Sequence, residues 1–272
     1  MTISTTRPGH DTDWGVTHYT YPDAMEATAW KGIRYGNKKG KQKDPEKTTR
    51  EEMDPETLAA AISRARKTVR VKCSSIGADH LLTLTYRENM QDLTRGWNNL
   101  KYCLKLMRQG GWEGHYVVVA EKQKRGAWHF HLALSGRQDV KAWRATWRHV
   151  VGEYDGMPGG NIDVQGPKEM NRRGITNSAQ LASYLSKYIS KGLDLGEFAT
   201  RRYRTSINIE VKKTVRYCSV SINDSVTVTN LERVYYELSG ELPRTTRYIP
   251  EREIIWFASW DDSYLKIKRR IQ

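Results

Sequence analysis

The sequence has few cysteines and no long apolar run, and each absence excludes a class of protein. Its three cysteines, Cys73, Cys103 and Cys218, are far apart and form no CxxC pair. This spacing argues against a zinc ribbon or a disulfide framework and favours a reducing compartment. No apolar stretch approaches the roughly 18 residues of a membrane-spanning helix, and the first residues lack the apolar core of a signal peptide. We therefore expect a soluble, cytoplasmic protein with no membrane partner.

Acidic residues are also in short supply. The chain of 272 residues has 31 Asp and Glu against 45 Lys and Arg, a formal net charge of +14. Such a surplus indicates a polyanionic partner, with nucleic acid as the first candidate. No GxxxxGK[ST] segment occurs, so the sequence gives no sign of a built-in ATPase motor. Hydrophobic residues make up 38% of the chain, enough for a sizeable core.

The hydrophobic pattern divides the chain into three parts. Residues 1–50 show no helical or strand period and are expected to form a basic N-terminal extension, whereas 51–220 carry strong patterns and form the central domain. Residues 221–272 favour a helical C-terminal extension. The basic run at 38–43 is either a solvated tether or an arm that contacts phosphates, and the sequence leaves both open.

Helix and strand patterns alternate irregularly in the central domain, which predicts an α+β fold. Helices are expected at 54–71, 90–108, 140–151 and 178–191, and strands at 80–86, 115–121, 128–134 and 160–164, with one or two more in 202–222. The segments 115–121 and 128–134 are joined by a short basic turn and should pair as a β-hairpin.

The helix expected at 178–191 carries a first chemical signal. Tyr184, Lys187, Tyr188 and Lys191 recur at helical spacing, so one helix face presents two phenols beside two ammonium groups. A phenol at its ordinary pKa near ~10 is a poor nucleophile, and nearby cations lower the cost of forming the phenolate. The alternative is a solvated helix face rich in Tyr and Lys.

The expected hairpin carries a second signal. Side chains alternate along a strand, so His129 and His131 share one face, and closure of the turn at Gly126 places Glu121 opposite His129. Two imidazoles and a carboxylate form an open site suited to Mg²⁺ or Mn²⁺. Gln123 is a weaker substitute for Glu121. The alternative is two half-exposed histidines that bind nothing.

Together the two signals suit attack on a phosphodiester. A divalent cation polarises the scissile phosphate, and a tyrosine phenolate displaces the 3′ oxygen. The product is a 5′-phosphotyrosine link and a free 3′-OH on the DNA.

Three segments carry a family resemblance. LTLT at 82–85, EKQKRGAWHFH at 121–131 and YLSKYISK at 184–191 are similar, in order and spacing, to the three motifs of rolling-circle replication initiators of the HUH endonuclease superfamily. The closest likeness is to the two-tyrosine initiators of single-stranded DNA phages and small plasmids. It spans about residues 54–220, and the first of the three motifs is weak alone.

The resemblance implies a central antiparallel sheet of about five strands flanked by helices, with the two histidines on a central strand. It implies metal ligation by His129 and His131, nucleophilic roles for Tyr184 and Tyr188, and supporting roles for Lys187 and Lys191; the third ligand, Glu121, rests on the hairpin geometry. The expected DNA contacts are the basic residues of the hairpin turn and of the loop before the tyrosine helix: Lys122, Lys124, Arg125, Arg172 and Arg173. The expected partners are single-stranded DNA, an origin able to form a hairpin, and a host helicase.

Other classes of function remain open at this point. One is an HUH transposase or relaxase, although such transposases usually use one tyrosine on a shorter chain and relaxases usually carry three clustered histidines. Another is a non-catalytic binder of single-stranded DNA, because the positive charge and the 9 Trp, 15 Tyr and 3 Phe would also serve phosphate contact and base stacking.

Overall fold

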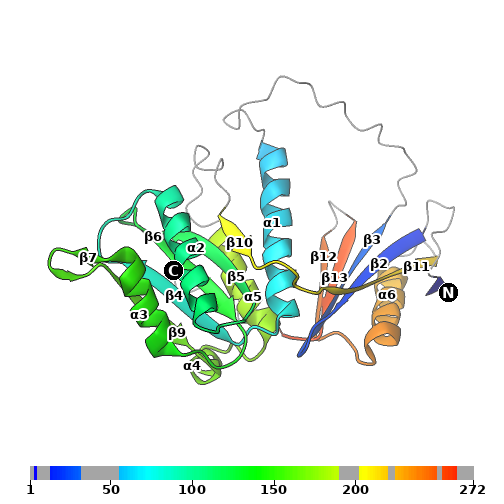
Figure 1. Ribbon diagram of the computed structural model, residues 1–272. Helices are drawn as coiled ribbons and strands as arrows, with labels where there is room; N and C mark the ends of the chain where they lie inside the picture. Colours follow the sequence, from blue (N-terminus) through cyan, green and yellow to red (C-terminus); the bar gives the residue numbers. More distant parts are fainter. Residues whose placement is uncertain are drawn as a thin grey trace. The chain divides into compact units, whose positions relative to one another are not determined.

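A computed structural model describes residues 3–4, 13–31, 55–189, 202–219, 224–249 and 253–261. The chain forms two compact units (Figure 1). One unit comprises Met1–Lys47 together with Val211–Gln272, and the other comprises Thr48–Glu210. No helix in the described residues is long and apolar enough to cross a membrane.

The unit Thr48–Glu210 is built on a five-stranded antiparallel sheet. In spatial order its strands are β10 (Tyr203–Thr205), β5 (Tyr116–Lys122), β6 (Trp128–Leu134), β4 (His80–Tyr86) and β9 (Gly160–Gln165). Every neighbouring pair is antiparallel. Helices flank this sheet, so the predicted α+β fold is confirmed, and β6 with its two histidines lies at the centre.

Helices cover the two faces of this sheet differently (Figure 1). On one face α2 (Leu93–Gln109) and α3 (Val140–Val151) bury the main core, which includes Phe130 and Leu132 of β6 beneath Trp97 and Trp143. The residues of β6 that alternate with Phe130 and Leu132, including His129 and His131, therefore point to the other face. That face is approached by α5 (Ser178–Ser186), which packs against α1 (Pro55–Ser75) and contacts β6.

The smaller elements of this unit lie at its periphery. The short helix α4 (Pro167–Arg172) follows β9, and β7 (Glu153–Tyr154) pairs with β8 (Met157–Pro158) in a small hairpin after α3. The helix α2 begins at Leu93, later than the expected residue 90, because Asp92 caps it by accepting a hydrogen bond from the Arg95 amide.

The tyrosine helix differs from its prediction as one α-helix over 178–191. The α-helix ends at Ser186 and tightens into the 3₁₀ turn η2 (Lys187–Ile189). The Lys187 amide donates to the Tyr184 carbonyl, three residues back, which is the 3₁₀ pattern. This turn places Ile189 in the interior, where only 5% of it is exposed. Neither Gly nor Pro marks the change, so helical periodicity alone could not reveal it.

The other unit contains a six-stranded antiparallel sheet. Its strands, in order, are β1 (Ile3–Ser4), β11 (Lys212–Ser219), β2 (Asp13–Thr20), β3 (Met25–Lys31), β13 (Ile254–Ala258) and β12 (Thr245–Ile249). The helix α6 (Asp224–Ser239) covers one face, where Leu231 and Tyr235 pack on Val16, Ala27 and Phe257.

This arrangement corrects the expected organisation of the chain ends. Residues 1–50 and 221–272 were expected as separate extensions, the second one helical, but both supply strands to one sheet, and β11 joins them rather than the central domain. The inward residues of β3 are small alanines, and one of its two partner strands, β13, lies near the other end of the chain, so the local sequence shows little strand pattern. The basic run 38–43 lies outside the described residues.

Candidate active site

The β5–β6 hairpin sets the geometry of the candidate metal ligands. Its ladder pairs Glu121 with His129 and Val119 with His131, the register expected from the sequence. The turn closes through hydrogen bonds from the Gln123 amide to the Ala127 carbonyl (2.9 Å) and from the Gly126 amide to the Gln123 carbonyl (2.8 Å). Gly126 has φ +90°, a backbone conformation that glycine adopts without strain.

His131 is held on both sides by neighbouring strands. Its Nε2 lies 2.7 Å from Oε2 of Glu121 on β5, and its Nδ1 lies 3.1 Å from Oγ1 of Thr83 on β4. The imidazole and the carboxylate are both buried. These contacts fix the ring plane of His131, and Thr83 can act as donor or acceptor, so it accommodates either neutral tautomer.

His129 has one satisfied and one unsatisfied ring nitrogen. Its Nδ1 lies 3.0 Å from the side-chain amide nitrogen of Gln123, whereas its Nε2 is buried and has no hydrogen-bond partner among the described residues. Burial lowers the pKa of His129 to about 4, the charges of His131 and Arg125 act in the same direction, and Glu121 opposes them. The ring is therefore neutral near pH 7, the form that ligates metals.

Glu121 and His131 could hold a divalent cation after a small adjustment. Within the described ranges, no three His, Cys, Asp or Glu side chains already surround one metal position. Two atoms bound side by side to one Mg²⁺ at about 2.1 Å lie about 3 Å apart. The Glu121–His131 separation of 2.7 Å is only slightly shorter, so those atoms need to part by a few tenths of an ångström. This pair is therefore compatible with Mg²⁺ or Mn²⁺, and the described side chains are not closed around an ion.

The two tyrosines meet the histidines from the other side. The Tyr188 ring, on η2, stacks on the His131 imidazole with centroids 4.3 Å apart and planes 10° from parallel. The Tyr188 hydroxyl donates a 2.6 Å hydrogen bond to the Tyr184 hydroxyl, and the two rings meet edge to face. The structure thus brings together two constellations that lie far apart in the sequence.

The electrostatics of this pair differ from the simple expectation that lysines favour the phenolate. Burial raises the pKa of Tyr188 far above its usual range, Tyr184 and Glu121 raise it further, and Arg173 acts in the opposite direction. The Tyr188 phenol is therefore neutral at physiological pH, and its ionisation needs more positive charge nearby. A divalent cation bound beside His131 would supply such charge.

The predicted supporting lysines lie in different situations. Lys187 is half-buried on η2, directly before Tyr188. Lys191 lies outside the described residues.

The basic residues of the hairpin turn are partly engaged within the protein. Lys122 Nζ lies 5.9 Å from the centre of the Trp128 ring, and Arg125 donates to the Tyr86 carbonyl at 3.0 Å. Lys124 is exposed. These contacts fix Arg125 and leave Lys124 as the open cation of this turn.

A polar row that the sequence interpretation missed links the sheet to Arg173, the residue after α4. Asp163 pairs with Thr83 in the β4–β9 ladder and so lies on the same face as His131. Gln165 donates to Asp163 at 2.8 Å, and Arg173 donates to Gln165 at 2.6 Å. The alternation of side chains along the strand 161–165 could have indicated this row. Arg172, the other predicted DNA contact in this region, is exposed.

Comparison with known proteins adds a family match. Residues 79–193 match the model of a family of replication-associated proteins, the one that includes ORF2. This stretch is less than half of the chain, but it runs from β4 to just beyond η2 and contains both the histidine and the tyrosine constellations. No curated protein and no solved structure matches the chain. The match supports a replication initiator of the Rep type, a protein that would act on DNA.

Proposed function

We propose that the protein initiates rolling-circle replication by nicking single-stranded DNA at an origin through metal-dependent tyrosine attack. The observation that supports the proposal is the stacking of Tyr188 on His131, because it sets a candidate nucleophile directly beside candidate metal ligands. The family match to replication-associated proteins agrees with this function.

The residues on the β5–β6 hairpin would hold the metal. His129 contributes its unsatisfied Nε2, and His131 and Glu121 contribute the atoms that now contact each other. A divalent cation held there supplies positive charge that polarises the scissile phosphate and favours the phenolate. Thr83 and Gln123 orient the two imidazoles from behind.

The tyrosines provide the covalent step. A phenolate oxygen attacks the phosphorus, the bond from phosphorus to the 3′ oxygen breaks, and the leaving oxygen takes up a proton to become the 3′-OH. The hydrogen bond from the Tyr188 hydroxyl to the Tyr184 hydroxyl has to break first, because Tyr188 donates its hydroxyl proton in it. Lys187 and Lys191 would neutralise charge on the phosphate.

Two adjacent hydroxyls suit a reaction that uses two attacks. One tyrosine holds the 5′ end while a 3′-OH primes synthesis, and the other attacks when the copied origin returns. The released 3′-OH then resolves the first link and closes a circle. A separation of 2.6 Å lets both hydroxyls reach one phosphate position after small side-chain rotations.

The decisive experiment is adduct formation with a labelled single-stranded oligonucleotide carrying the origin sequence. The proposal expects a protein–DNA species that survives denaturing electrophoresis, requires Mn²⁺ or Mg²⁺ and is absent in excess chelator. Adduct formation in full chelator would contradict the metal role. Binding without any adduct in either metal would instead favour the non-catalytic single-strand binder, which the net charge of +14 also suits.

A further inference from the structure

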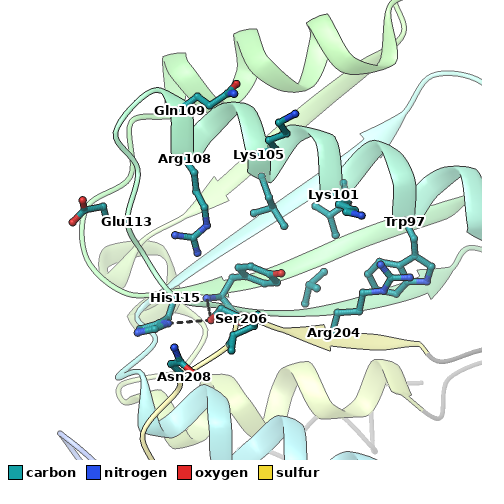
Figure 2. A pocket seen from close by; sticks show the side chains of 15 residues that line it. Trp97, Lys101, Lys105, Arg108, Gln109, Glu113, His115, Arg204, Ser206 and Asn208 are labelled. Atoms are coloured by element: carbon teal, nitrogen blue, oxygen red, sulfur yellow. Dashed lines mark hydrogen bonds between the residues drawn. The ribbon is translucent and has the colours of Figure 1, made fainter.

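The unit Thr48–Glu210 has a hollow on the opposite side of its sheet from the tyrosines. It lies between α2 and the strands β5 and β10 and encloses about 780 Å³ (Figure 2). Tyr116 and Val118 of β5 line it, and by strand alternation they face away from Glu121. The hollow is therefore separate from the candidate active site, and no role has been assigned to it.

The floor of this hollow is apolar and aromatic. Trp97, Leu100 and Leu104 of α2 are almost fully buried and continue into the main core. The half-buried Tyr116 ring adds a second aromatic surface. A flat, uncharged ring such as a nucleobase is the kind of group that such a floor accepts.

Cations surround the floor. Arg204 of β10 lies over the Trp97 ring at 4.5 Å, and Arg108 at the end of α2 donates to the Gly114 carbonyl at 3.2 Å. In Figure 2 Arg108 reaches down from α2 while Arg204 reaches up from β10. Burial raises the pKa of Tyr116, and both guanidinium groups act in the opposite direction. Lys101 and Lys105 are exposed on the lip, and Glu113 is the one acidic residue in the lining.

We propose that this hollow, the α2–β10 groove, binds a segment of single-stranded DNA outside the site of nicking. Phosphates contact Lys101, Lys105, Arg108 and Arg204, and a base enters the apolar floor beside Tyr116. The strand reaches the groove around β10, which is the edge strand of the sheet. This site extends the proposed function and rests on it, since it would hold DNA beyond the scissile phosphate.

The form of the groove favours a single strand over a duplex. A duplex keeps its bases stacked and paired, so it cannot place them on the aromatic floor and would not settle against the lip cations above that floor. An unpaired strand uses both. Exposed Ile207, at 83% relative exposure, borders the opening and gives further apolar surface to a splayed base.

The test measures binding of a fluorescent oligo-dT of about 24 nucleotides to the full chain over a range of salt concentrations, in chelator so that no nicking intervenes. The variant Lys101→Gln/Lys105→Gln should make the log–log salt slope shallower by about 1.4 and weaken binding about 25-fold at 0.1 M salt, since each phosphate contact contributes about 0.7. The matched control Lys141→Gln/Arg148→Gln removes the same charge from exposed positions of α3 outside the groove and should leave the slope unchanged.

Two further comparisons identify the occupant. Ile207→Glu should weaken binding more than Ile207→Gln, because only the first places a negative charge beside the phosphates. A blunt duplex of the same length should bind the groove variant and the parent chain alike.

Three outcomes would overturn the proposal. One is a salt slope unchanged by Lys101→Gln/Lys105→Gln, and another is an equal loss in the α3 control. The third is an equal loss with the duplex. Each is measured without catalysis, so failure here is distinguishable from failure of the nicking reaction.

Discussion

At the scale of single residues, the state of the two imidazoles defines the candidate site. His129 offers a buried nitrogen without a hydrogen-bond partner among the described residues, and His131 is fixed between Glu121 and Thr83. The arrangement at His129 is costly for a histidine without a ligand, because an unsatisfied buried polar atom costs about 1–3 kcal/mol. A cation between them would recover that cost.

Removing either imidazole should abolish metal-dependent chemistry. His129→Ala or His131→Ala is expected to lower the rate of adduct formation on the order of 10²-fold or more, because even partners behind the ligands are worth 10–100-fold. Oligonucleotide affinity should stay near that of the parent chain, and Mn²⁺ titration calorimetry should show weaker binding. His149→Ala, an exposed position on α3, is the matched control. Normal Mn²⁺ affinity in both site variants would refute these ligands.

Gln123 offers a finer test, since it contacts His129 at 3.0 Å and does not need to touch the ion. Gln123→Ala frees the imidazole to rotate, and we expect Mn²⁺ affinity to fall about 10–100-fold while the fold is retained. Calorimetry measures this directly, with Gln180→Ala, on the half-buried surface of α5, as a comparison. If Gln123→Ala lowered the free energy of unfolding by as much as it weakened the free energy of Mn²⁺ binding, Gln123 would instead have a structural role.

Sequence reasoning reached part of this site. Strand alternation and a short turn were enough to pair Glu121 with His129, because both are local properties. The contact of Glu121 with His131 and the stacking of Tyr188 were not accessible in this way. They depend on side-chain rotamers and on the packing of segments distant in the chain.

At the scale of elements, the close approach of α2 to the sheet supports the histidine strand. Gly96 lies directly over Phe130, the residue between the two histidines. A Cβ added at Gly96 would lie 2.9 Å from the end of that ring, which is fully buried and so cannot move easily.

Gly96→Ala should therefore destabilise the protein although alanine favours helices. The gain in helix propensity is about 1 kcal/mol, whereas overpacking typically costs about 1–3 kcal/mol. We expect a net loss of about 1 kcal/mol in the free energy of unfolding, seen as a lower urea midpoint with an unchanged slope. Asn98→Ala, exposed on the same helix, should raise stability slightly. Equal stabilisation by both would show that the packing at Gly96 is loose.

At the scale of the whole molecule, the two ends of the chain depend on each other. In the sheet of their unit, β2 pairs with β11 and β3 pairs with β13, so the N-terminal hairpin β2–β3 lies between C-terminal strands. The strands of the other unit come from one continuous segment, which is why their local patterns predicted the sheet. In the unit formed by the two ends, β2–β3 and β12–β13 are local pairs, but the pairs that join them to the rest of the sheet, β2–β11 and β3–β13, connect opposite ends of the chain, so local patterns did not reveal the whole sheet.

Truncations should reflect this organisation. Deleting residues 1–47 removes β2 and β3, exposes apolar surface of Phe257 and Leu231, and should unfold the remainder of that unit. A fragment of residues 48–210 should keep a cooperative unfolding transition and metal-dependent adduct formation. Limited proteolysis and thermal unfolding measure whether the deletion variant has lost that unit and whether the 48–210 fragment stays folded. Rapid digestion of the 48–210 fragment at its core strands would contradict the division into units.

The central claim is that Tyr184 and Tyr188 are the nucleophiles at one metal site, and it is tested most directly by covalent capture of DNA. Labelled origin oligonucleotide is incubated with Mn²⁺ and each of Tyr184→Phe, Tyr188→Phe and the double variant, and adducts are resolved on a denaturing gel and mapped by mass spectrometry. We predict no adduct for the double variant, residual nicking for each single variant, and loss of strand transfer that needs two attacks in both. An adduct in the double variant, or circle release at the parent rate by either single variant, would contradict the account.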